Sequence, residues 1–192
     1  MKYLYFLIIG CMFLSSCETE SQNKSELNDK NSNEMEVLNS FDSLNLMAEQ
    51  IINNGFDPKL QLQNIKLGRE LYKLSSLKIQ DKGLVISDSL KECLYQWAAL
   101  GAEASEHYND AITYFHKAQR NFPKSSNAPK YLHNIARIIE DKLRNKKGAR
   151  LAYEELIELY PNHPLSKNSK TYLENVFDKT DAELIELIQV EK

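Results

Sequence analysis

The chain has 192 residues, and 24 lysines and arginines against 27 acidic residues leave a formal charge of −3. This length suits one modest domain, and 6 glycines with 5 prolines exclude a collagen-like or linker-dominated chain. Because the charge is nearly balanced, the chain lacks the excess of basic residues that is typical of nucleic-acid-binding proteins, and we expect no nucleic-acid partner. Three cysteines are too few for a disulfide framework.

The N-terminal 17 residues are typical of a secretory signal. Lys2 precedes an apolar run over residues 3–14, which is shorter than the stretch of about 20 residues that crosses a bilayer core. Residues 14–17, Leu-Ser-Ser-Cys, resemble the lipobox of bacterial lipoproteins, so Cys17 is expected to carry a lipid that palmitate would label. Cys11 is a second candidate, because residues 8–11 fit the same pattern. An ordinary signal peptide or a short membrane anchor is the alternative.

Residues 18–39 are predicted to form a flexible acidic tether. Their apolar residues are few and scattered, so they cannot bury enough surface to offset the entropy of ordering. Six acidic residues stand against two lysines here, and residues 40–192 contain acids and bases in equal number. If Cys11 leaves with the signal and Cys17 carries the lipid, Cys93 remains alone. We therefore expect no intramolecular disulfide in the exported chain.

From residue 40 onward the apolar residues follow a helical spacing. A stripe that starts at Phe41 predicts a helix over residues 41–54, which Asn53, Asn54 and Gly55 should end. A second helix is predicted from about residue 57 to residue 79. The residues expected to face inward are Phe41, Leu44, Met47, Ala48, Ile51 and Ile52 in the first helix, and Leu60, Ile65, Leu67, Leu71, Leu74 and Leu77 in the second.

An internal repeat is the strongest pattern in the C-terminal half. At a shift of 38 residues, Ala111, Phe115, Ala118, Phe122 and Pro123 align with Ala149, Tyr153, Leu156, Tyr160 and Pro161. Upstream, at a shift of 37 residues, Tyr95, Ala98, Ala99 and Ala102 align with Leu132, Ile135, Ala136 and Ile139. Each repeat is therefore predicted to be a helix, a short turn and a second helix that ends at a proline.

This repeat resembles the tetratricopeptide repeat (TPR), which has about 34 residues, small residues in both helices and a terminal proline. Residues 92–123 and 127–161 carry the resemblance, and buried alanines would allow their helices to approach closely. The resemblance implies an all-α, TPR-like solenoid of antiparallel helix hairpins over residues 40–192. Capping helices are expected over residues 163–190, because a stacked repeat cannot cover its own end face.

The resemblance also implies a partner-binding groove on the first helix of each repeat. The family's groove positions fall on Gln96, Leu100 and Glu103 in the first repeat, and on His133, Arg137 and Glu140 in the second. The Lys and Asn clamp with which chaperone-binding TPRs hold a C-terminal carboxylate is missing from the corresponding positions. We therefore expect the groove to take an extended segment or a helix of a protein partner.

The sequence carries no motif that predicts an enzyme. Its four histidines form no metal-ligand spacing, and no P-loop, G-x-G-x-x-G or G-x-S-x-G occurs, so we expect no catalytic residue, metal or cofactor. The predicted function is a lipid-anchored scaffold for protein–protein interaction in cell-envelope or outer-membrane assembly. The protein is expected to be exported to the outer membrane, with the side of the membrane left open. A glycan- or peptidoglycan-binding TPR lipoprotein and a purely structural spacer are the alternatives.

Overall fold

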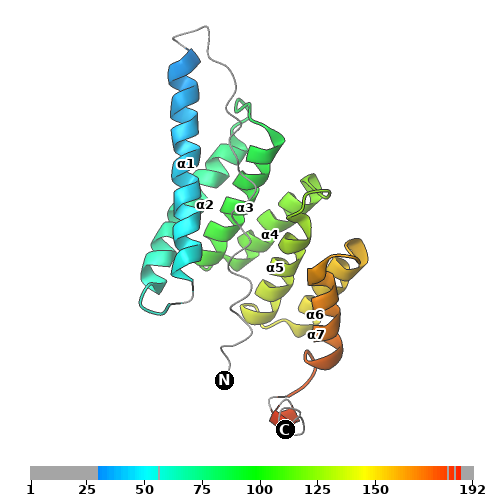
Figure 1. Ribbon diagram of the computed structural model, residues 1–192. Coiled ribbons are helices and arrows are strands. Elements are labelled where there is room, and N and C mark those ends of the chain that lie inside the picture. Colours follow the sequence, from blue (N-terminus) through cyan, green and yellow to red (C-terminus); the bar gives the residue numbers. More distant parts are fainter. Residues whose placement is uncertain (1–29, 56, 181, 184, 187–192) are drawn as a thin grey trace. The chain divides into compact units, whose positions relative to one another are not determined.

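The structure is a computed structural model that describes residues 30–180 except 56, and residues 182, 183, 185 and 186 (Figure 1). All regular elements in these residues are helices. Side chains are described from residue 40 onward. The helices are α1 (Lys30–Asn54), α2 (Gln61–Gln80), α3 (Asp88–Ala104), α4 (Tyr108–Asn121), α5 (Ala128–Asp141), α6 (Lys146–Leu159) and α7 (Pro164–Asn175). No strand occurs in this part of the chain, and the prediction of an all-α fold is confirmed.

The chain divides into two compact units, residues 1–111 and residues 112–192, and the division falls within α4. Unit 1 contains α1, α2 and α3, and unit 2 contains most of α4 with α5, α6 and α7. Each unit is described by itself. The predicted signal and the anchor at Cys17 lie outside the described residues.

The first helix is longer than its sequence pattern indicated. α1 begins at Lys30, within the segment predicted to be a tether. Residues 30–39 contain neither proline nor glycine, so the helix can extend from its packed part at one hydrogen bond per added residue. The prediction of a flexible tether is therefore wrong for residues 30–39, and residues 18–29 lie outside the described part.

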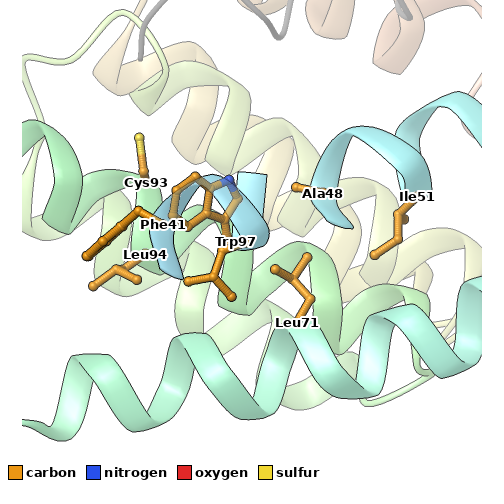
Figure 2. Close-up of a cluster of buried hydrophobic side chains, with 8 residues drawn as sticks. Phe41, Ala48, Ile51, Leu71, Cys93, Leu94 and Trp97 are labelled. Carbon is orange, nitrogen blue, oxygen red and sulfur yellow. The ribbon is translucent and has the colours of Figure 1, made fainter. Parts of the chain in front are cut away.

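In unit 1, α1 packs on α2 and α3 through a hydrophobic core cluster (Figure 2). The rings of Phe41 and Trp97 lie 6.1 Å apart between centroids, and Leu71 contributes a fully buried side chain from α2. The predicted inward positions of α1 are confirmed for its four buried members. The buried residues of this core cluster are Phe41, Leu44, Ala48, Ile51, Leu71, Cys93, Leu94 and Trp97.

The face that α2 buries differs from the predicted leucine face. Its buried residues are Asn64, Gly68, Leu71 and Ser75, whereas Leu77 is 54% exposed. A Cβ added to Gly68 would meet the carbonyl oxygen of Gly101 on α3 at 2.8 Å. The backbones of α2 and α3 are therefore in contact, which larger side chains at these positions would prevent. The predicted inward face is confirmed for Leu71, with Leu67 and Leu74 partly buried against the core cluster, and it is wrong for Leu77.

The turn between α1 and α2 is fixed by asparagine side chains. α1 ends at Asn54, and Gly55 follows with a left-handed φ of 53°, which confirms the predicted stop. The Asn54 side-chain amide donates to Asn64 Oδ1 at 2.7 Å, and Asn64 Nδ2 donates to the Gly55 carbonyl at 3.1 Å. Asn64 is therefore buried with its polar groups satisfied.

Cys93 lies in the core cluster of unit 1. Its side chain is buried there, and it is disulfide-bonded in the full-length chain. The expectation of no disulfide concerned the exported chain, from which the signal has been removed, and it stays a prediction. The two other cysteines of the sequence, Cys11 and Cys17, lie outside the described residues.

In unit 2, α6 packs against α5 and α7, and α5 also contacts α7. Ala136 of α5 and Ala149 of α6 are fully buried, which confirms the small-residue positions of the second repeat. The Tyr160 hydroxyl donates to the Pro123 carbonyl at 2.9 Å and accepts from Gln119 Nε2 at 3.2 Å. The residues that end the two predicted repeats are thus hydrogen-bonded to each other.

The predicted C-terminal capping segment is described in part. α7 ends at Asn175, and of the next two residues Phe177 is buried while Val176 is exposed. Val176 has left the helical conformation with φ −127°, so the helical period no longer decides which way its side chain faces. Of residues 181–190, only 182, 183, 185 and 186 are described, and all four are exposed helical residues.

Candidate functional site

Three of the six predicted groove residues follow one another along α5 in unit 2. His133, Arg137 and Glu140 are spaced by four and three residues, so they share one face of the helix. All three are half-buried, and we call them the α5 face. Pro129 lies in the first turn of α5. Proline is tolerated there because the N–H groups of the first turn have no partner within the helix.

The Glu140 carboxylate accepts hydrogen bonds from two tyrosines. The Tyr153 hydroxyl of α6 donates to Oε2 at 3.1 Å, and the Tyr172 hydroxyl of α7 donates to Oε1 at 2.5 Å. Burial, followed by the interaction with Glu140, raises the pKa of both tyrosines, so their hydroxyls remain protonated donors. Glu140 therefore joins three helices rather than presenting a free carboxylate.

The same two tyrosines belong to an aromatic cluster with Phe177. The ring centroids of Tyr153 and Tyr172 lie 5.7 Å apart, and Phe177 lies 6.3 Å from Tyr153 and 5.8 Å from Tyr172. All three pairs meet nearly edge to face, and each such contact contributes about 1 kcal/mol beyond burial. Arg150 lies over the Phe177 ring at 4.9 Å and pairs with Asp178. The two tyrosines that bind Glu140 are therefore themselves held by packing against each other and against Phe177.

His133 is a neutral member of the α5 face. Its ring meets Tyr153 edge to face at 6.0 Å. Burial and, to a lesser extent, the neighbouring charge of Arg137 lower the pKa of His133 to about 4. At pH 7 the imidazole therefore offers one donor and one acceptor, and Arg137 carries the positive charge of this face.

The other three predicted groove residues lie on α3 in unit 1. Gln96, Leu100 and Glu103 are half-buried there, and Leu100 packs against the hydrophobic core cluster. Burial and then the charges of Glu106 and Glu103 raise the pKa of Tyr108. Three of the six residues thus lie on α3 of unit 1, and three lie on α5 of unit 2.

A small pocket of about 170 Å³ lies in unit 1, where the end of α2 meets the start of α3. None of the predicted groove residues lines it. The lining residues of the pocket are Lys78, Ile79, Asp81, Leu84, Ile86, Lys91, Leu94 and Tyr95.

The described residues contain neither a cluster of metal-ligating side chains nor a membrane-spanning helix. In this part of the chain, no three His, Cys, Asp or Glu side chains gather closely enough to hold a metal ion. The helices that the structure describes include none with the length and apolar content needed to cross a membrane.

No protein-family model, curated protein or solved structure matches this chain. The resemblance to the TPR family therefore rests on the repeat in the sequence and stays a prediction. Within unit 2, α5 contacts both α6 and α7.

Sequence reasoning missed the role of two tyrosines. Tyr153 belongs to the helical stripe of the second repeat, and nothing in the spacing pointed to a bond of Tyr153 or Tyr172 with Glu140. A signal was nevertheless present in the residue type, because a buried tyrosine needs a hydrogen-bond partner where a phenylalanine does not. Glu140, on the neighbouring predicted helix, was the acceptor to consider.

Proposed function

We propose that this protein is a lipid-anchored scaffold of TPR type that binds a protein partner in the cell envelope through its α5 face. One observation carries the proposal: the Glu140 carboxylate is held by tyrosines from α6 and α7. This bonding fixes the adjacent His133 and Arg137 on a rigid helix face. A preorganised polar surface of this kind loses little conformational entropy when a partner binds.

The solenoid part of the proposal is supported by packing inside unit 2. α5 contacts α6 and also α7, which is the pattern expected when helix pairs stack in series. The fully buried Ala136 and Ala149 allow the close pairing of α5 with α6. We propose a binding role rather than a catalytic one, because the acidic group of the α5 face is already occupied by two intramolecular donors.

The partner-binding proposal is tested with Arg137→Ala and the matched control Arg120→Ala, an exposed arginine of α4 in the same unit. Each variant is crosslinked in cells, recovered and analysed by mass spectrometry. We expect Arg137→Ala to lose at least one partner that wild type and Arg120→Ala retain, with helicity by circular dichroism unchanged. A partner list that is identical for all three proteins contradicts binding through the α5 face.

We also propose that Cys17 carries the lipid and that the protein is anchored in the outer membrane. Cys17→Ser should abolish palmitate labelling and membrane fractionation, whereas Cys11→Ser should leave both unchanged. Labelling that survives Cys17→Ser contradicts the anchor. Mass analysis of the mature protein without reductant also shows whether Cys93 is disulfide-bonded after the signal is removed.

Glycan or peptidoglycan binding is the alternative function. Sugar sites usually stack a ring on an exposed aromatic side chain, but no aromatic residue in the described part of the chain is classed as exposed. The single tryptophan, Trp97, is only 5% exposed, in the core of unit 1. These observations favour a protein partner, and specific binding on a glycan array would favour the alternative.

A further inference from the structure

The turn between α5 and α6 concentrates positive charge. Residues 142–147, which we call the basic turn, contain Lys142, Arg144, Lys146 and Lys147, and all four are exposed. Asp141 immediately precedes the turn, and the next acidic residue along the chain is Glu154. Residues 40–192 as a whole contain acids and bases in equal number, so the rest of this body, without the basic turn, is acidic.

The backbone of the basic turn is well defined by hydrogen bonds. The amides of Lys142 and Leu143 donate to the Ile138 carbonyl at 3.0 and 3.1 Å, and the Asn145 amide donates to the Ile139 carbonyl at 3.0 Å. Asn145 Oδ1 then caps α6 by accepting from the Gly148 amide at 2.9 Å. Lys142 and Arg144 therefore lie on a short, ordered connection, and Lys146 and Lys147 lie in the first turn of α6.

Arg144 occupies a position where glycine is favoured. Its φ is 54°, in the left-handed region that commonly follows the C-terminus of a helix. An arginine in this conformation is less favourable than a glycine because its Cβ approaches the backbone. A positive charge is thus present where backbone stability alone would select another residue.

Three carboxylates of unit 2, those of Glu140, Glu154 and Asp178, are engaged by other residues. Glu140 accepts from two tyrosines, and Arg150 pairs with Asp178 and, at 3.9 Å, with Glu154. Within the described part of the chain, Arg144, Lys146 and Lys147 make no ion pair. Lys146 also lies over the Phe177 ring, with its Nζ 5.3 Å from the centroid, and its charge, like those of Arg144 and Lys147, faces no carboxylate of the described residues at ion-pair distance.

We propose that the basic turn docks on the anionic lipid headgroups of a membrane. Headgroup phosphates accept several charge-assisted hydrogen bonds from lysine and arginine, and an anionic surface attracts bases within a Debye length of about 10 Å at 0.1 M salt. Leu143, which is 39% exposed between Lys142 and Arg144, adds an apolar contact suited to the interface. The inference rests on the membrane part of the proposed function and does not depend on the α5 face.

The test uses the full chain on two kinds of vesicle, pure phosphatidylcholine and a mixture with phosphatidylglycerol, with flotation showing that the protein is bound to both. Amide hydrogen exchange of residues 142–148 is then compared. We expect exchange at least about threefold slower on the anionic vesicles, because docking restricts local opening. Salt at 0.5 M should remove the difference, since screening then acts over only a few ångströms.

The decisive variant is Arg144→Gln, Lys146→Gln and Lys147→Gln combined, which should exchange at the same rate on both vesicles. Its matched control combines Lys124→Gln, Lys167→Gln and Lys170→Gln, three exposed lysines of unit 2 with the same total charge change. The control should keep the wild-type difference. If both triple variants lose it, net charge rather than the basic turn is responsible, and the proposal is overturned.

Equal exchange of the wild-type chain on both vesicles also overturns the proposal. If that exchange then becomes faster when Glu18, Glu20 and Glu26 are changed to glutamine, the turn is covered by the chain's own acidic segment. A missing lipid on Cys17 would be detected separately by palmitate labelling. The vesicle comparison is then made only where flotation shows that the chain is bound to both lipid mixtures.

Discussion

Inside unit 1 and inside unit 2, the helices contact one another in different ways. In unit 1, α2 and α3 approach until backbone meets backbone at Gly68 and Gly101. In unit 2, the helices are joined by polar side chains, with tyrosines of α6 and α7 bonded to Glu140 of α5. The first arrangement depends on the absence of side-chain volume, and the second depends on hydroxyl groups that must keep their acceptor.

This difference teaches that similar helix patterns can respond to mutation in opposite ways. A backbone contact tolerates no added atom, because the opposing backbone cannot move without breaking its own helix. A hydrogen-bonded contact tolerates changes in volume better but leaves buried donors unsatisfied when the acceptor is removed. Each of the following variants therefore acts on one kind of contact.

Gly101→Ala should have the largest effect and should act on unit 1. Its Cβ would lie 2.5 Å from the Tyr72 backbone nitrogen and 2.8 Å from the Gly68 carbonyl oxygen. We expect a loss of about 3 kcal/mol in the free energy of unfolding, measured by guanidinium denaturation. Hydrogen exchange should locate the faster opening in α2 and α3. The control is Gly83→Ala, where the nearest atom is a flexible carboxylate oxygen of Asp81 at 3.3 Å, and an equal loss in both variants would contradict the backbone contact.

Glu140→Ala should have the next largest effect and should act on unit 2. The change leaves the hydroxyls of Tyr153 and Tyr172 without their acceptor, and we expect a loss of about 2 to 3 kcal/mol. In the double variant Tyr153→Phe and Tyr172→Phe, the same Glu140→Ala change should reduce stability by less than about 1 kcal/mol, because no donor is left unsatisfied. Glu158→Ala, at an exposed position of α6, serves as the control. Equal losses in both backgrounds would show that the tyrosine bonds do not stabilise the unit.

Lowering the pH should destabilise unit 2 through His133. The unfolded chain binds this proton near pH 6.5 and the folded chain only near pH 4. The resulting stability is complete above pH 6.5 and is lost as the pH falls toward 4, with a loss of about 2 kcal/mol between pH 7 and pH 5. His116 and His163, whose pKa values burial also lowers, act in the same direction. The measurement is therefore the difference between wild type and His133→Gln in denaturant melts, and parallel pH dependences of the two would refute the assignment.

Much of the fold follows from local sequence signals. The stripe that starts at Phe41 and the stop at Asn54 and Gly55 were predicted, because helical spacing and left-handed glycine are properties of a few consecutive residues. The start of α1 at Lys30 was not predicted, since a polar stretch can continue a helix that is stabilised further along. The helices of both predicted repeats are present.

The sequence predicted which residues lie together in the candidate site, but not which of their side chains are hydrogen-bonded. The spacing of His133, Arg137 and Glu140 placed them on one face, and the structure keeps them together on α5. The state of each side chain was beyond the sequence. Whether Glu140 is free or bonded depends on Tyr153 and Tyr172, which come from two other helices.

The amino-acid order by itself determined where helices form and where most of them end, because backbone conformation responds to neighbours within a few positions. It also marked the small residues of the repeat. Only the tertiary structure decided which face of α2 is buried, which carboxylate the tyrosines share and which bases remain without an acidic partner. Those outcomes depend on distances between segments far apart in the chain, and such distances are set by packing rather than by local preference.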